Sequence, residues 1–123
     1  MIGDLSEALR ASWSVETAAP EDRPAWTPQN PARGQCAVTA LIVHDHLGGR
    51  LVRGEVHVND IRVDFHWWNE LPDGTHVDLT RDQFAPDEIV VGAEPVDRPD
   101  TPGRFAVEYD LLRTRVEGRI TPV

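Results

Sequence analysis

Three stretches of the chain carry apolar residues at the spacing of one helical face. They cover residues 5–13, 36–47 and 101–116. The middle stretch has the longest apolar run. Gly48-Gly49 follows it, which predicts a helix that ends where glycine takes the left-handed backbone conformation. We therefore expect three helices, of which the one over residues 36–47 is the best defined.

Runs typical of β-strands lie between the second and third predicted helices. Val, Phe, Trp and Thr are frequent in them, and several of them alternate polar with apolar residues. The runs cover residues 51–58, 62–71, 75–80 and 89–91. The order helix, loop, helix, several antiparallel strands, helix predicts an α+β fold. A chain of 123 residues has room for one domain, so we assign residues 1–123 to a single domain.

Two proline-containing segments interrupt this pattern. Residues 14–34 predict a long extended loop, and two interpretations of it stay open: a functional loop or an arm that covers the core. Residues 95–103 predict a solvated linker before the last helix.

The turn between the second and third strands decides which side chains share a face. Pro72-Asp73-Gly74 predicts a three-residue hairpin loop, so that Leu71 pairs with Thr75. Because side chains alternate along a strand, one face is then polar. That face carries Asp64, His66, Trp68, Glu70, His76, Asp78 and Thr80. On it His66 and Asp78 are diagonal neighbours, close enough for the carboxylate to orient the imidazole, whereas a two-residue loop would place them on opposite faces.

The composition leaves one thiol as the candidate nucleophile of the chain. The chain has a single cysteine, Cys36, and all 12 of its basic residues are arginine. One cysteine excludes an intrachain disulfide and a multi-thiolate zinc site, and the lack of lysine excludes Schiff-base and P-loop chemistry. In the first turn of the predicted helix, unpaired N–H groups favour a Cys36 thiolate and can hold an oxyanion, with the Gln35 amide as a second donor. A simpler interpretation, a small buried hydrophobic residue, stays open.

The charge of the chain excludes some partners. Acidic residues outnumber basic ones by 21 to 12, giving a net charge of −9, which disfavours nucleic acids and anionic membranes as partners. No apolar stretch approaches the ~18 residues that would span a bilayer. The N-terminal residues lack the cationic and apolar regions of a signal peptide, so we expect a cytoplasmic protein.

The spacing of His44 and His46 after Cys36 fits no common zinc pattern, and we expect neither a metal nor a cofactor.

Short motifs around these residues resemble the transglutaminase-like core of the papain-like cysteine hydrolase superfamily. The motifs are Cys36, His66-Trp67-Trp68 and Asp78-Leu79-Thr80, in the order Cys, His, Asp. The resemblance implies a compact core in which the helix that carries the cysteine packs on a small antiparallel sheet. Gln35 departs from the papain pattern, because the oxyanion glutamine of those proteases lies several residues before the cysteine.

Longer blocks of the sequence resemble the YunG family of small bacterial proteins. These blocks are NPARGQCAVTAL (30–41), LGG (47–49), HWWN (66–69) and DLTRDQF (78–84). The resemblance implies the same compact papain-like or transglutaminase-like domain, and it names no substrate.

These residues support two hypotheses of different classes. The preferred one is a cysteine-dependent acyl-transfer enzyme, in which Cys36 attacks an acyl carbonyl, His66 takes the thiol proton and Asp78 orients His66. Its substrate is a small-molecule or peptide acyl compound; Gln35 helps to hold the oxyanion, and Trp68 walls the pocket or shields the triad from water. The alternative is a non-catalytic domain that keeps the same core and binds a ligand or a protein. The oligomeric state, and hydrolysis versus transfer, stay open.

Overall fold

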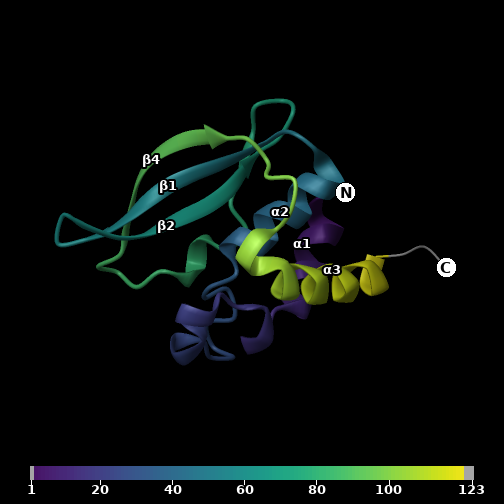
Figure 1. Ribbon diagram of the computed structural model, residues 1–123, viewed down its shortest axis with the longest axis horizontal. Helices are drawn as coiled ribbons and strands as arrows, with labels where there is room; N and C mark the ends of the chain where they lie inside the picture. The colour runs from purple at the N-terminus through teal and green to yellow at the C-terminus, as the bar shows by residue number, and fades with distance from the viewer. Residues whose placement is uncertain (1, 121–123) are drawn as a thin grey trace.

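An antiparallel sheet of four strands and three α-helices form the architecture of residues 2–120, the part of the chain that the computed structural model describes (Figure 1). The helices are α1 (Ile2–Ser12), α2 (Cys36–Leu47) and α3 (Ala106–Ile120). The strands are β1 (Arg50–Val58), β2 (Ile61–Glu70), β3 (His76–Val77) and β4 (Ile89–Val96), in the order β3-β2-β1-β4. The predicted α+β class is confirmed. Within residues 2–120, no helix combines the length and the apolar character needed to cross a membrane.

Helix α2 lies against the sheet and at the centre of the core. It begins at Cys36 and ends at Leu47, as predicted, and Gly48 after it has a φ of 72°. On one side, Asn69 of β2 donates a 3.0 Å hydrogen bond from Nδ2 to the Ala40 carbonyl oxygen. On the other side, α2 contacts α1 and α3. The fully buried side chains of this core include Leu9, Ile42 and Leu112. Packing on both sides therefore sets the position of the first residue of α2.

Two tight turns set the register of the sheet. Asn59 and Asp60 join β1 to β2 with positive φ angles of 52° and 63°, as in a two-residue hairpin turn. In the next turn, the Leu71 N–H donates to the Thr75 carbonyl oxygen at 2.8 Å, and Gly74 has a φ of 89°. The predicted three-residue loop is confirmed, and with it the register in which β2 pairs with β3.

Helices α1 and α3 are displaced from their predicted ranges. Helix α1 begins earlier than predicted, at Ile2, and α3 begins and ends later, at Ala106 and Ile120. A 3₁₀ helix over Gly103–Phe105 precedes α3. Apolar periodicity marks the buried turns of a helix, so it does not locate terminal turns whose side chains face solvent.

Strand β4 is longer than predicted. It covers Ile89–Val96, so part of the segment predicted as a solvated linker belongs to the sheet. Gly92 has a φ of 80°, and the register of β4 against β1 shifts at this level, as in a β-bulge beyond which pairing resumes. Pro95 fits because β4 is an edge strand. The linker that follows is also held to α2, since Arg98 donates to the Leu41 carbonyl oxygen at 2.7 Å.

The prediction of an extended loop over residues 14–34, called the arm below, is wrong. The arm contains two 3₁₀ helices, Val15–Thr17 and Pro20–Ala25. The Ala19 N–H donates to the Gly34 carbonyl oxygen at 2.9 Å, and a Cβ added at Gly34 would lie 2.7 Å from the Asp22 Cβ. This close approach holds the arm against the segment that enters α2.

We expect Gly49→Ala to destabilise the protein much more than Gly74→Ala. Both glycines have left-handed φ angles, 83° and 89°. A Cβ at Gly49 would also overlap the Glu70 carbonyl oxygen, whereas nothing lies within 4 Å of a Cβ at Gly74. The expected losses in the free energy of unfolding, measured by urea denaturation, are about 3–4 kcal/mol for Gly49→Ala and about 1–2 kcal/mol for Gly74→Ala. Equal losses would contradict the close approach of the α2–β1 turn to β2.

Candidate functional site

His66 and Asp78 form the centre of the candidate site. His66 lies on β2 with its side chain fully buried, and Asp78 directly follows β3. The His66 Nε2 atom lies 2.7 Å from Asp78 Oδ2, so the predicted contact between the two side chains is confirmed. Within residues 2–120, the buried His66 Nδ1 atom has no hydrogen-bond partner. One ring nitrogen is therefore tied to a carboxylate, and the other is open.

Two aromatic side chains enclose the His66 ring. Trp68 stacks on it with ring centroids 5.5 Å apart and planes at 27°, and Phe84 meets it edge-on at 4.7 Å. The Trp68 indole N–H in turn donates to His76 Nδ1 at 2.9 Å. Gly54 on β1 makes room for the indole, because a Cβ there would lie 3.0 Å from two of its atoms. Of the two roles predicted for Trp68, this packing supports shielding of the imidazole from water.

Cys36 is the first residue of α2 and is half-buried. Burial raises the pKa of its thiol to about 12, and nearby carboxylates act in the same direction. These carboxylates belong to Asp64, Asp22 and Asp78. The Trp67 backbone N–H, which hydrogen-bonds the thiol, lowers this pKa and offsets part of the rise. The helix start favours a thiolate, as predicted, but the loss of solvent outweighs this effect, so the net pKa lies above that of a free thiol.

Asp78 connects the cysteine to the histidine. Its carboxylate binds His66 and also acts on the Cys36 thiol, and the Trp67 N–H that reaches Cys36 belongs to the residue after His66. The three residues Cys36, His66 and Asp78, called the Cys–His–Asp cluster below, therefore lie near one another. No hydrogen bond joins the thiol to His66 Nδ1, since within the described chain Nδ1 has no partner.

Gln35, predicted as an oxyanion donor, hydrogen-bonds residues of the arm. Its side chain is fully buried, and its Nε2 donates to the Ser14 carbonyl oxygen at 3.0 Å and to the Arg33 carbonyl oxygen at 3.5 Å. Its Oε1 accepts a 2.7 Å hydrogen bond from the Thr17 hydroxyl. Both amide N–H groups are thus used within the protein, so we do not assign the predicted oxyanion role to Gln35.

Gln83 and Phe84 contribute to the site, although sequence analysis gave neither a role. Gln83 is buried; its Oε1 accepts from the Gly34 N–H at 3.2 Å, and its Nε2 donates to the Thr80 carbonyl oxygen at 3.0 Å. It therefore ties the segment that follows β3 to the turn before α2. No periodic pattern marks Gln83 or Phe84, because they lie at the end of a short 3₁₀ helix. The block 78–84 that resembles the YunG family was the one signal that included them.

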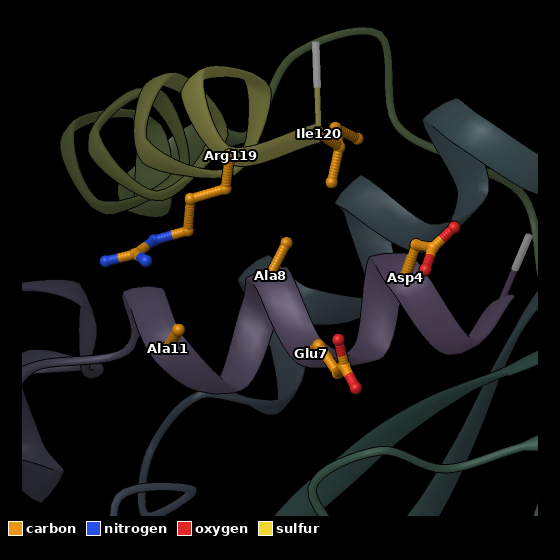
Figure 2. Close-up of a pocket in the computed structure, with 6 residues that line it drawn as sticks. All are labelled: Asp4, Glu7, Ala8, Ala11, Arg119 and Ile120. Atoms are coloured by element: carbon orange, nitrogen blue, oxygen red, sulfur yellow. The ribbon is translucent and has the colours of Figure 1, made fainter. Parts of the chain in front are cut away.

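Among residues 2–120, the candidate site included, no group of three or more His, Cys, Asp or Glu side chains is arranged to hold a metal ion. A hollow of about 450 Å³ lies between α1 and α3, where Figure 2 shows Arg119 extending from α3 over α1. Its lining residues are Asp4, Glu7, Ala8, Ala11, Arg119 and Ile120. Arg119 Nε already donates to the Ser12 hydroxyl at 3.1 Å. The lining includes no thiol, hydroxyl or imidazole, so we assign this hollow no chemistry.

The chain is similar to one described protein family over nearly its whole length. The model of the family described as YunG protein matches residues 1–121. The "Uncharacterized protein YunG" of Bacillus subtilis (strain 168) is 36% identical over 76 residues, which are 62% of this chain and 56% of the Bacillus protein. The matched region thus spans a little more than half the length of that relative. No solved structure shows a significant match to the chain.

The raised pKa of Cys36 predicts a loss of stability in alkaline solution. The thiol ionises near its ordinary pKa of 9.0 in the unfolded chain and near 12 in the folded protein. Between these values the unfolded state binds fewer protons, so the free energy of unfolding falls as the pH rises. We expect the wild type to lose up to ~1.4 kcal/mol per pH unit above about pH 9 relative to Cys36→Ala.

Urea denaturation at several pH values between about 7 and 10 measures this difference. Tyr109, whose pKa burial also raises, titrates in both proteins and so cancels in the comparison. Parallel pH profiles for the wild type and Cys36→Ala would contradict a protonated, desolvated thiol. They would instead indicate a thiol with the same pKa in the folded and unfolded protein, whereas a thiolate in the folded state would make the wild type gain stability between about pH 7 and 9.

Proposed function

The chain belongs to the YunG family, and we propose that it is a cysteine-dependent acyl-transfer enzyme, a hydrolase or acyltransferase that acts on a small-molecule or peptide acyl compound. In this proposal Cys36 is the nucleophile, His66 is the general base and Asp78 orients the base. One observation carries the proposal. The buried His66 ring has Nε2 bound to Asp78, and its Nδ1 has no hydrogen-bond partner among the described residues, while the Cys36 thiol is bound by the backbone N–H of the next residue, Trp67.

The Asp78 carboxylate supports the base in two ways. Because it accepts a hydrogen bond from Nε2, it favours the tautomer of His66 that leaves a lone pair on Nδ1. Its negative charge also stabilises the imidazolium that forms when Nδ1 takes a proton. His66 Nδ1 is therefore the atom that receives the thiol proton.

The thiol enters the reaction in its protonated form, because its pKa of about 12 keeps it neutral at physiological pH. As Cys36 Sγ bonds to the carbonyl carbon, the S–H proton moves to His66 Nδ1 and the carbonyl π electrons move to the oxygen. The N–H groups in the first turn of α2 have no carbonyl partner within the helix and bind this oxyanion.

Collapse of the tetrahedral intermediate completes the first half of the reaction. The carbon–oxygen double bond re-forms, the bond to the leaving group breaks, and the leaving group takes the proton from His66 Nδ1. Cys36 then carries the acyl group as a thioester. Water or an amine attacks this thioester while His66 removes its proton, and the Cys36 thiol is restored.

The same elements support a papain-like or transglutaminase-like core as part of this proposal. Cys36 begins a helix that packs on an antiparallel sheet, His66 lies on β2, and Asp78 follows the adjacent strand β3. The order Cys, His, Asp along the chain is that of the core which the sequence resembles.

A non-catalytic binding domain is the second candidate. The raised pKa of the Cys36 thiol favours it, because a thiol that burial keeps protonated is a poor nucleophile unless a base contacts it. His66 and Asp78 then form a structural pair, and the core binds a ligand or a protein. The two candidates differ in whether Cys36 accepts an acyl group in the folded protein.

We expect p-nitrophenyl acetate to acetylate Cys36 in the folded protein, with a burst of p-nitrophenolate and a mass increase of one acetyl group. Cys36→Ala abolishes both signals. Because His66 acts as the base, His66→Gln slows acetylation by about 10²–10⁴, and Asp78→Asn also slows it. His57→Gln is the matched control, because His57 lies on β1 and pairs with Glu55 rather than with the cluster.

Circular dichroism checks that each variant is folded before its rate is compared. Acetylation of the wild type that His66→Gln and His57→Gln slow equally would contradict the role of His66. Acetylation of Cys36 only after unfolding would contradict the enzyme proposal and support the non-catalytic binding domain.

A further inference from the structure

An apolar pocket of about 210 Å³ lies between α2, the β1–β2 pair and the segment that leads into α3. Its lining residues are Ala37, Ala40, Leu41, Leu51, Trp67, Pro99, Pro102, Arg104 and Phe105. Arg104 is the one charged residue among them. Its guanidinium is already occupied, because it pairs with Glu21 at 2.6 Å and lies 4.3 Å from the Phe105 ring centroid. The pocket therefore offers a ligand almost nothing but apolar surface.

The pocket lies next to Cys36 through two of its walls. Ala37 follows Cys36 directly on α2, and Ala40, four residues after Cys36, lies on the same side of the helix. Trp67 lines the pocket, while its backbone N–H hydrogen-bonds the Cys36 thiol. A group bound in the pocket therefore contacts the residue next to Cys36 and the residue whose backbone N–H binds the thiol.

We propose that this pocket binds the apolar group attached to the carbonyl that Cys36 attacks. This inference rests on the proposed function and names its substrate class. The pocket is smaller than the ~300–1,000 Å³ of sites for drug-sized ligands, so it takes one short aliphatic or aromatic group. An empty apolar pocket forfeits dispersion contacts that such a group restores. The group is either the chain of an aliphatic acyl compound or the apolar side chain of a peptide.

A binding experiment tests the pocket without turnover. The probes are hexanamide, N-acetyl-leucine amide and, as a matched control, acetamide, each titrated into Cys36→Ser and followed by the backbone amide signals in NMR spectra. We expect hexanamide or N-acetyl-leucine amide to shift the signals of Ala37, Leu41 and Leu51, and acetamide to leave them in place. The stronger of the two probes identifies the source of the group, an acyl chain or a peptide side chain.

A kinetic experiment tests the pocket during turnover. With p-nitrophenyl esters from acetate to hexanoate, we expect kcat/KM to rise about fourfold per methylene, the equivalent of ~0.8 kcal/mol for each buried CH₂. Ala37→Leu fills the pocket and lowers the ratio of hexanoate to acetate turnover by about tenfold. Ala11→Leu is the matched control, because Ala11 is exposed on α1 and does not line the pocket, and it leaves the ratio unchanged.

The outcomes separate this inference from the proposed function. Hexanamide binding that Ala37→Leu abolishes, in a protein whose Cys36 is never acetylated, supports the pocket and overturns the enzyme. Turnover with no preference for chain length, unaffected by Ala37→Leu, supports the enzyme and overturns the pocket. If hexanamide does not bind and no ester is turned over, both the pocket and the enzyme are overturned.

Discussion

The turn closed between Leu71 and Thr75 is the constraint on which the candidate site depends. Because side chains alternate along a strand, a shift of one residue in this hairpin would turn Asp78 away from the face that carries His66. Gly74 permits the three-residue loop, since its φ of 89° lies in the region that other residues avoid. The 2.7 Å contact between imidazole and carboxylate is thus a consequence of local turn chemistry.

Two buried glutamines hold together the segments that meet at the site. Gln35 bonds to the arm, and Gln83 bonds to Gly34 at the end of the arm. A buried amide left without partners costs about 1–3 kcal/mol, so moving the arm away would be opposed by both side chains. Of the two interpretations of the arm that the sequence left open, these contacts favour a fixed cover over the core.

The Cys36 thiol shows how burial and local charge compete. The start of α2 favours the thiolate through its N–H groups, but desolvation and the nearby carboxylates of Asp64, Asp22 and Asp78 favour the thiol, and together they prevail. On the side of Trp67, the thiol is followed by the apolar pocket. In the proposed reaction, a nucleophile with a raised pKa depends on a base, which makes His66 Nδ1, without a hydrogen-bond partner among the described residues, the decisive atom of the cluster.

Short-range patterns in the sequence determined much of this protein. They predicted both ends of α2, the turn after Leu71 and the polar face that joins His66 to Asp78, because helix periodicity, glycine conformation and strand alternation act between near neighbours along the chain. Only the tertiary structure decided the pKa of Cys36 and the contact of Phe84 with the imidazole. It likewise decided the course of the arm and the commitment of the Gln35 amide to it. These depend on how deeply each group is buried and on which distant segments pack against it, and neither property is carried by the spacing of residues along one segment.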